Sequence, residues 1–485
     1  MIWVSKALRR PNHNIKLSVT ILLYIGIFRK NFTLPIQRKN IIIRIYPAQQ
    51  FRSQIRGKME IRLKNHADAL IFHAFPRTQV FSEWEISMRV LFYRYGSICE
   101  PDIIEALTQL SFTVDEIDDE IYNKNITPAE SIQTVRRRLD NAGSSSSGYT
   151  FIFTVNYFPW LSEVCSIYGI LYFSLIVDSP VMELYSDSIK HSCNRVFLFD
   201  RCLYNEFAPQ NPGHIFHIPL ATNTERSRRV IENASDDSKR RFSSDISFIG
   251  SLYTEKCLYN SVSLPEYEKG FAEGLIEAQL NVYGYNFIEE CLTDEFVKTF
   301  LANAPGHYEF PANSRHAFKA LVAQQYISVK AAEQERIRAL TMLSRDFNVD
   351  LYTGSDTSGM PRVHNRGFAK SLTEMPLIFS QSKINLNITA KSIRSGLSLR
   401  IFDILGCGGF LITNYQAELP EFFELGVELE TYSSMEELHD KCAYYLSHDS
   451  ERRAIARRGY EKTAARHSYA TRLLQMMDMA SKSSN

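Results

Sequence analysis

Near its C-terminal end the chain reads Arg394-Ser-Gly-Leu-Ser-Leu-Arg-Ile-Phe-Asp403-Ile-Leu-Gly-Cys-Gly-Gly-Phe-Leu-Ile-Thr413-Asn-Tyr-Gln-Ala-Glu418-Leu-Pro420. This order predicts a loop, a helix, a glycine turn, a buried strand and a polar loop that carries a carboxylate. The expected helix has one apolar face, formed by residues at offsets of four, five and eight: Leu397, Ile401, Phe402 and Leu405. A helix between a loop and a buried strand is typical of α/β proteins, and the stretch therefore predicts that fold class.

The start of this helix would bring three kinds of group together. They are the backbone N–H groups of residues 395–398, the positive side chains of Arg394 and Arg400, and the Asp403 carboxylate about one turn into the helix. Amides and the helix dipole favour phosphates, and a carboxylate accepts hydrogen bonds from ribose hydroxyls. The segment therefore predicts a site for a nucleoside diphosphate. The alternative is that Arg400 and Asp403 only form an i,i+3 surface pair.

Further candidates for this site follow other predicted strands. Gly250 would let the backbone approach a phosphate, and Lys256 would supply positive charge. Asn387 ends a buried run, at the edge where α/β sheets bind ligands. Glu418 is expected either to touch a sugar or to cap the helix that opens near Pro420. The alternatives are a plain turn at Gly250 and a loop cap at Asn387.

The first half of the chain offers one main candidate. Asp178 stands at the end of an apolar run, so it is expected at a strand end, where it would orient an acceptor or act as a base. A capping role for the next helix is the alternative. His217 belongs to an apolar run and is expected to be a core histidine.

Two motifs carry a resemblance to a known family. The run Ser395-Gly-Leu-Ser-Leu-Arg-Ile-Phe-Asp403-Ile-Leu-Gly406-Cys-Gly408 resembles the signature of the group 1 (family-4-like) glycosyltransferases, in particular the branch of the spore maturation protein CgeB. Asp403 stands at the second carboxylate of that signature, and Ser395 replaces the first. The run Ile249-Gly-Ser-Leu-Tyr-Thr-Glu-Lys256 resembles a second family motif, with Ser251 in place of the customary Arg. The resemblance covers nearly everything after Met88.

The resemblance implies the GT-B fold, in which two doubly wound Rossmann-like domains face each other across a cleft. The C-terminal domain would bind a nucleotide-sugar donor, and the N-terminal domain would present a glycan, protein or small-molecule acceptor. Asp178 and Asp403 are the expected catalytic residues. The expected donor-binding residues are Gly250, Ser251, Lys256, Asn387, Arg394, Ser395, Gly396, Leu397, Arg400, Asp403 and Glu418. Since no Asp-x-Asp pair stands at a strand end, we expect no metal ion and no cofactor beyond the donor itself.

The resemblance favours a cytoplasmic, bacterial glycosyltransferase acting in spore-coat or cell-envelope glycan synthesis. One alternative is a catalytically inactive GT-B binding or assembly protein, which the losses at Ser251 and Ser395 favour. The other is a nucleotide-sugar epimerase, which would need acid and base side chains gathered in the cleft.

The length of 485 residues predicts more than one domain. Apolar runs and helical patterns alternate from Met88 onward, as expected for parallel sheets covered on both faces. We expect an N-terminal domain over 88–240 and a C-terminal domain over 241–465, with a helical insertion at 265–346 and a tail helix at 466–485. The polar residues 222–244 are expected to connect the domains, and residues 184–191 are expected to form a helix.

The charge is small overall and uneven along the chain. The formal net charge is +1, which argues against nucleic acid as a partner, but residues 1–64 hold fourteen Lys or Arg and one acid, Glu60. The apolar segment Leu17–Phe28 is too short for the ~20 residues that span a bilayer, so we expect no stable membrane insertion. We interpret residues 1–87 as an extension upstream of the native protein; the alternative is an arm that binds a membrane surface.

The cysteine pattern gives no sign of a disulfide framework or a metal site. The chain has 8 Cys with no C-x-x-C spacing. In a chain of this length the pattern predicts reduced, mostly buried thiols of a cytosolic protein.

Overall fold

A computed structural model describes residues 17–21, 41–45, 60–62, 88–143 and 148–482. The chain divides into two compact units, Met1–Ile86 and Ser87–Asn485. In the first unit, β1 (Leu17–Ile21) pairs parallel with β2 (Ile41–Ile45), which pairs antiparallel with β3 (Glu60–Arg62). The rest of the expected N-terminal extension, including most of Leu17–Phe28, lies outside the described residues.

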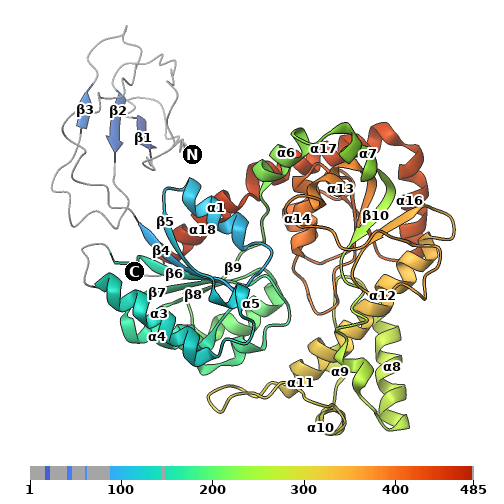
Figure 1. The fold of residues 1–485 in the computed structure, drawn as a ribbon, viewed down its shortest axis with the longest axis horizontal. Coiled ribbons are helices and arrows are strands. Elements are labelled where there is room, and N and C mark those ends of the chain that lie inside the picture. The colour runs from blue at the N-terminus through green and yellow to red at the C-terminus, as the bar shows by residue number, and fades with distance from the viewer. Residues whose placement is uncertain (1–16, 22–40, 46–59, 63–87, 144–147, 483–485) are drawn as a thin grey trace, which may run out of the picture. The chain divides into compact units, whose positions relative to one another are not determined.

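The second unit contains two six-stranded sheets (Figure 1). The first sheet is parallel throughout, in the order β5-β4-β6-β7-β8-β9. Its strands are β4 (Arg89–Tyr93), β5 (Thr113–Ile117), β6 (Phe151–Val155), β7 (Leu171–Leu175), β8 (Asn194–Leu198) and β9 (Ile215–His217). Strands β6 and β8 are buried along their whole length, which fits the apolar run of β6 and the apolar second half of β8.

Helices cover both faces of this sheet. They are α1 (Glu100–Gln109), α2 (Asp119–Tyr122), α3 (Pro128–Gly143), α4 (Pro159–Tyr168) and α5 (Arg201–Phe207), with short 3₁₀ segments η2 (Met182–Tyr185), η3 (Asp187–Lys190) and η4 (Ala208–Gln210). A capping box opens α3, because Glu130 accepts from Thr127 N at 2.8 Å while Glu130 N donates to Thr127 Oγ1 at 3.3 Å.

The second sheet is also parallel, in the order β12-β11-β10-β13-β14-β15. Its strands are β10 (Ser244–Ile249), β11 (Val349–Tyr352), β12 (His364–Asn365), β13 (Ser382–Asn387), β14 (Leu411–Asn414) and β15 (Glu430–Tyr432). Around it lie α6 (Thr224–Glu232), α7 (Asp236–Arg241), α13 (Met375–Gln381), α14 (Leu399–Gly406), α15 (Leu419–Phe422), α16 (Met435–Ser447) and α17 (Asp449–Arg466).

A largely helical segment separates β10 from β11. It contains η5 (Leu258–Ser261), α8 (Glu266–Leu280), α9 (Ile288–Cys291), α10 (Asp294–Ala302), α11 (Phe318–Leu321), the π-helical η6 (Val322–Ile327) and α12 (Ser328–Leu343). The loop before α11 pairs with the first domain: Asp187 N donates to Asn313 O at 2.8 Å, and Arg315 N donates to Tyr185 O at 2.9 Å. This segment therefore touches both halves of the unit.

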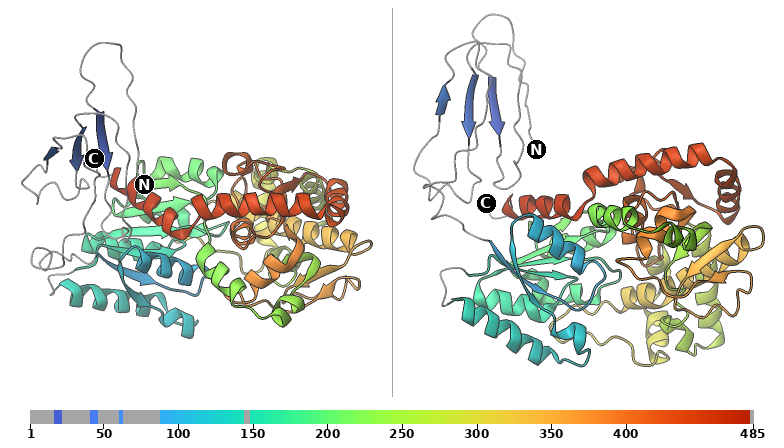
Figure 2. Two further views of the ribbon diagram at one scale, coloured as in Figure 1. Left: turned by 90° about the horizontal axis from the view of Figure 1, so that it is seen from above. Right: turned by 45° about the horizontal axis from the view of Figure 1, so that its top comes forward.

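The last helix returns to the first sheet. In Figures 1 and 2, α17 runs along the second half and α18 (Tyr469–Lys482) continues onto α1. Tyr469, Leu473 and Met476 are buried in the same core cluster as Ile103 and Leu107 of α1. The chain therefore crosses between the two sheets twice, and the second crossing anchors the C-terminal end in the first domain.

The predicted architecture of two doubly wound α/β domains is confirmed by these sheets. Three local expectations were wrong or incomplete. Residues 184–191 form parts of the 3₁₀ segments η2 and η3 and no α-helix. The polar connector forms α6 and α7. Strand β5 was missed because it is an edge strand whose sequence, Thr-Val-Asp-Glu-Ile, contains too few apolar residues to form a continuous run.

The carboxyl ends of the two sheets meet. Ser179, which follows β7, donates from Oγ to Ser392 O at 2.8 Å, and Ser392, which follows β13, donates back to Ser179 O at 2.9 Å. Parallel α/β sheets bind ligands at this edge, so we expect the functional site where the two edges touch.

The described residues contain neither a membrane-spanning helix nor a cluster of metal ligands. None of the helices in the described ranges combines the length and the apolar character needed to cross a bilayer. The same ranges hold no cluster of three or more His, Cys, Asp or Glu side chains arranged for a metal ion. All eight cysteines are free and six are buried, as predicted, with Cys202 partly and Cys291 fully exposed.

Candidate functional site

The loop before α14 binds a carboxylate of the first domain. Backbone N–H groups of three successive residues, Arg394, Ser395 and Gly396, donate to Asp200 Oδ2 at 2.7, 3.0 and 3.3 Å. Asp200 also caps α5, since its Oδ1 accepts from Leu203 N at 3.1 Å. Successive amides that converge on one anion form the kind of concavity that binds phosphates in other proteins. The predicted anion-binding amides therefore exist, and an internal carboxylate occupies them.

Glycine is required at this contact by close backbone approach. A Cβ atom on Gly396 would lie 2.7 Å from Phe199 O and 2.8 Å from Asp200 Cα. The glycine of the motif therefore lets the loop dock against the turn between β8 and α5. Leu397 turns inward from the same loop and is buried in the core of the second domain.

Glu418 is the centre of a second contact between the domains. Its Oε1 accepts from Ser395 Oγ at 2.7 Å and from Arg201 N at 2.8 Å, and its Oε2 lies 2.7 Å from His217 Nε2. Burial raises the pKa of Glu418, but the contacts with His217, Arg201 and Ser395 outweigh it, so the pKa is lowered. His217, expected as a core histidine, is mostly buried and has the Glu418 carboxylate as its partner. Glu418 makes no cap bond at α15.

Arg394 takes part in an ion-pair network. Its Nη2 donates to Glu206 Oε2 at 2.8 Å, and Glu206 Oε1 also accepts from Tyr185 and from Arg315. Although burial lowers the pKa of Arg394, Glu206 and Asp200 raise it. Among the residues that the structure describes, none accepts a hydrogen bond from its buried Nε. The guanidinium thus stays charged and keeps a donor unused.

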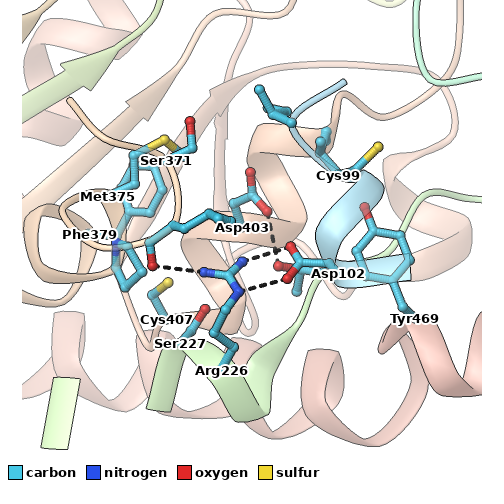
Figure 3. Close-up of a pocket in the computed structure, with 15 residues that line it drawn as sticks. Cys99, Asp102, Arg226, Ser227, Ser371, Met375, Phe379, Asp403, Cys407 and Tyr469 are labelled. Atoms are coloured by element: carbon cyan, nitrogen blue, oxygen red, sulfur yellow. Dashed lines mark hydrogen bonds and ion pairs between the residues drawn. The ribbon is translucent and has the colours of Figure 1, made fainter. Parts of the chain in front are cut away.

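Asp403 lies one turn into α14, as predicted, and lines a small pocket (Figure 3). Its Oδ1 accepts from Thr222 Oγ1 at 2.9 Å, and Arg400 Nη1 lies 3.3 Å from Oδ2. Burial raises the pKa of Asp403, against the opposing effects of Arg400 and Thr222. Arg400 also stacks on Phe379 at 5.4 Å. The alternative of an i,i+3 pair is therefore present, but the pair is partly buried rather than on the surface.

An arginine of α6 crosses this pocket. Figure 3 shows the Arg226 guanidinium turned toward Asp102 of α1, to which it makes two hydrogen bonds of 2.7 Å. A third bond runs from Nη1 to Leu372 O at 3.0 Å. The remaining volume is about 30 Å³, which holds one or two water molecules. The pocket beside Asp403 therefore has little free space in this conformation.

The Gly250 motif lies at the end of β10. Ser251 Oγ accepts from Tyr253 N and donates to Glu255, both at 2.8 Å, which fixes a tight turn. Lys256 is exposed. The cation next to Gly250 is Arg336 of α12, whose guanidinium donates to Ser251 O and to Ile388 O.

Asn387 and Asp178 lie at the carboxyl ends of their strands. The side-chain amide of Asn387 donates to Thr389 and Thr413 at 2.9 Å, and its oxygen accepts from Ser398 Oγ at 3.2 Å. Asn387 therefore fixes the start of α14 from within. Asp178 is exposed and accepts from Asn156 Nδ2 at 2.7 Å, beside the contact between Ser179 and Ser392.

The structure gathers most of the predicted residues around one loop. Arg394, Ser395, Gly396 and Glu418 share one network with the first domain, while Arg400 and Asp403 line the neighbouring pocket. Gly250, Ser251 and Lys256 lie at the next strand end, and Lys256 joins neither group. No local sequence pattern points to Asp102, Asp200, Arg226 and Arg336, because their partners are far away in the chain.

Part of the chain matches a family model. Residues 333–478 match the model described as glycosyl transferase-like. The match spans Asn387, the 394–403 loop and helix, and Glu418. A comparison with curated proteins found no match.

Several solved structures are similar to the chain at low identity. A glycosyltransferase from Rickettsia africae ESF-5 is 10% identical with a TM-score of 0.46, over 82% of this chain and 98% of that chain. Sucrose-phosphate synthase from Thermosynechococcus elongatus is 12% identical with a TM-score of 0.46, over 81% and 98%. Anabaena HepE in complex with UDP and glucose is 12% identical with a TM-score of 0.43, over 81% and 100%.

Proposed function

We propose that the chain is a glycosyltransferase that transfers a sugar from a nucleotide-sugar donor to a hydroxyl-bearing acceptor. The observation that carries this proposal is the match of residues 333–478 to the glycosyl transferase-like family, because the match contains the loop and helix whose groups fit a nucleoside diphosphate. In the transfer, the acceptor oxygen bonds to the anomeric carbon while the bond from that carbon to the diphosphate breaks. The diphosphate leaves with the electron pair, and the acceptor proton passes to a base.

The residues around α14 can be given roles in this reaction. The amides of residues 394–396 would bind the leaving diphosphate, and the Arg394 guanidinium would add positive charge. Asp403 would accept from the ribose hydroxyls. Asp178, an exposed carboxylate at the carboxyl end of β7, would take the acceptor proton. In this proposal no metal ion is needed, since amides and arginines neutralise the developing charge.

Donor binding requires a different arrangement of the contact between the domains. Asp200 occupies the amides that would hold the diphosphate, and the 30 Å³ beside Asp403 cannot hold a ribose. Asp200 and the Arg226–Asp102 pair must therefore move away before the donor enters. Hinge opening between two domains is a common way to admit a substrate.

A second candidate function is a catalytically inactive member of the same fold that binds or assembles. The observation that favours it is Ser395, which replaces the first carboxylate of the motif and takes part in the contact with Asp200 and Glu418.

The resemblance adds two expectations to the proposed function. They are a place in spore-coat or cell-envelope glycan synthesis, as in the CgeB-like branch, and a cytoplasmic location.

Turnover separates the two candidates. Purified full chain is incubated with UDP-, GDP-, TDP- and ADP-linked sugars and a panel of hydroxyl-bearing acceptors, with and without a metal chelator, and the free nucleoside diphosphate is measured. A glycosyltransferase releases the diphosphate from one of these donors, and Asp178→Asn slows the release. If none of the donors is consumed although its nucleotide binds, the inactive candidate is supported.

A further inference from the structure

A larger cavity lies on the other side of Arg394, in the helical segment between β10 and β11. Its volume is about 280 Å³, close to the lower end of the ~300–1,000 Å³ typical of ligand pockets. Its polar lining consists of Asn286, Glu289, Glu290, Lys319, Gln324 and Arg394. The cavity is therefore the size of one small molecule, and it shares Arg394 with the proposed donor loop.

The lining includes an acceptor that the described residues leave unused. Gln324 is 2% exposed, and its Nε2 donates to Glu289 Oε2 at 3.1 Å. Within the described ranges its Oε1 accepts no hydrogen bond. Arg394 lines the same cavity and binds Glu206 through Nη2. A polar ligand in the cavity can therefore donate to Gln324 Oε1 and meet the positive charge of Arg394.

The charges of the lining balance. Two carboxylates, Glu289 and Glu290, face two cations, Lys319 and Arg394. A charged ligand would meet groups of like charge as well as groups of opposite charge in this lining. A hydroxyl group both donates and accepts, so a hydroxyl-rich, uncharged molecule fits the lining best.

Two exposed aromatic rings neighbour lining residues without lining the cavity themselves. Tyr285 is 54% exposed, and its hydroxyl donates to Glu290. Phe318 is 36% exposed, directly precedes Lys319 and packs edge-on against Phe310 at 5.4 Å. A sugar ring carries hydroxyls on its rim and C–H groups on its faces. Flat apolar rings suit those faces where a bound sugar extends beyond the polar cavity.

Gln324 also stands in an unusual backbone segment. The π-helical η6 (Val322–Ile327) joins α11 to α12. Such segments make up well under 1% of residues and are frequent at functional sites. The backbone geometry thus independently marks the wall of this cavity.

We propose that this cavity binds an uncharged saccharide, which is the acceptor of the transfer; this role rests on the proposed function. The acceptor hydroxyl oxygen forms the new bond to the anomeric carbon of the nucleotide sugar, and the bond from that carbon to the diphosphate oxygen breaks. The diphosphate leaves with the electron pair, and the hydroxyl proton goes to a carboxylate. Arg394 then contacts both substrates, since it belongs to the donor loop and to the cavity wall.

The test is saturation-transfer NMR on the full chain with neutral probes: glucose, galactose, mannose, N-acetylglucosamine and N-acetylgalactosamine. Glucuronate and glucosamine serve as charged comparisons. We expect at least one neutral sugar to bind more tightly than both charged ones. Gln324→Leu should weaken that binding about tenfold or more, because it removes a buried polar partner. Gln334→Leu, on α12 outside the cavity, is the matched control.

Phe318→Ala provides a second variant that tests the cavity without altering a buried side chain, and it should also weaken binding of the sugar. The inference is overturned if no neutral sugar binds the wild-type protein, or if Gln324→Leu and Phe318→Ala bind as the wild type does. The melting temperature with nucleoside diphosphates is recorded in parallel. A nucleotide response without sugar binding contradicts this inference alone. Sugar binding without a response to any nucleotide supports the saccharide site and contradicts the transfer.

Discussion

Asp403 combines a cost in stability with a role in the proposed donor site. Burial raises its pKa, so the folded state disfavours the carboxylate. A group whose pKa is raised on folding contributes stability below its unfolded pKa, and that contribution is lost as the pH rises through the folded pKa. Asp403 therefore stabilises the fold less as the pH rises. Functional residues often carry such a cost.

We therefore expect Asp403→Asn to raise the melting temperature of the ligand-free protein by a few degrees at pH 7, while it weakens nucleotide binding. The amide oxygen can still accept from Thr222, and the cost of the buried charge is gone. Asp102→Asn is the comparison: it weakens two hydrogen bonds from Arg226 and should lower the melting temperature. A lower melting temperature for Asp403→Asn would contradict this account of the site.

The pKa of Glu418 shifts in the opposite direction to that of Asp403. Its pKa is lowered on folding, so it contributes stability above its unfolded pKa, near 4.5, which is lost as the pH falls through the folded pKa. We expect Glu418→Gln to cost about 1–3 kcal/mol at pH 7, because buried partners lose a charged acceptor. The variant should also lose less stability than the wild type below pH 4.5. Urea titrations at pH 7 and pH 4 measure both effects.

The control for this pH effect is Glu421→Gln. Glu421 pairs with Arg201 on the surface, and exposed pairs contribute ~0–1 kcal/mol. Suppose that Glu421→Gln lowers the free energy of unfolding as much as Glu418→Gln does. The contact of Glu418 with His217 and Ser395 would then contribute no more stability than a surface ion pair.

At the scale of elements, the 394–396 loop and the start of α5 hold each other through Asp200. Asp200→Asn keeps the cap of α5, since Asn and Asp are about equally good N-cap residues. It removes the negative charge from the amides of residues 394–396. We expect the variant to be less stable without ligand and to bind nucleoside diphosphates more tightly. Calorimetric titration measures the affinity, and weaker binding than the wild type would contradict internal competition by Asp200.

The elements that the sequence predicted have local causes. Continuous apolar runs predict the buried strands, and the pair Thr127 and Glu130 predicts the capping box. Residues 394–406 predict the loop followed by α14. The elements that it missed depend on context. Strand β5 lies at the edge of its sheet and has two adjacent acids between its apolar residues. Residues 184–191 form 3₁₀ turns that pair with the loop at Asn313.

The site could be predicted only in part for a related reason. Residues 394–403 carry a compact signal, because their spacing is local. Asp200 meets Ser395 from the other domain, and Arg226 meets Asp102 across 124 positions. No local spacing reports such contacts. Gly396 likewise meets distant residues, because it admits the backbone of residues 199–200.

At the scale of the whole second unit, α18 ties the C-terminal end to the first domain. Leu473 is 2% exposed and lies in the core with α1, while its neighbour Leu474 is only partly buried. We expect Leu473→Ala to cost about 2–5 kcal/mol and Leu474→Ala clearly less, as measured by urea unfolding. Equal losses would show that α18 packs in a different register. Because α17 and α18 connect the two sheets, this anchor limits how far they can separate.

Thermal melting of the full chain tests whether the 394–403 segment forms a nucleoside diphosphate site. The melting temperature is recorded with UDP, GDP, TDP and ADP, each with and without magnesium. A ligand that binds only the folded state stabilises it by about 2.7 kcal/mol at a hundredfold excess over Kd. We expect a rise in melting temperature with one nucleotide that is independent of magnesium and lost in Asp403→Ala. No rise with any of the four, or a rise unchanged in Asp403→Ala, would contradict a nucleoside diphosphate site in this segment.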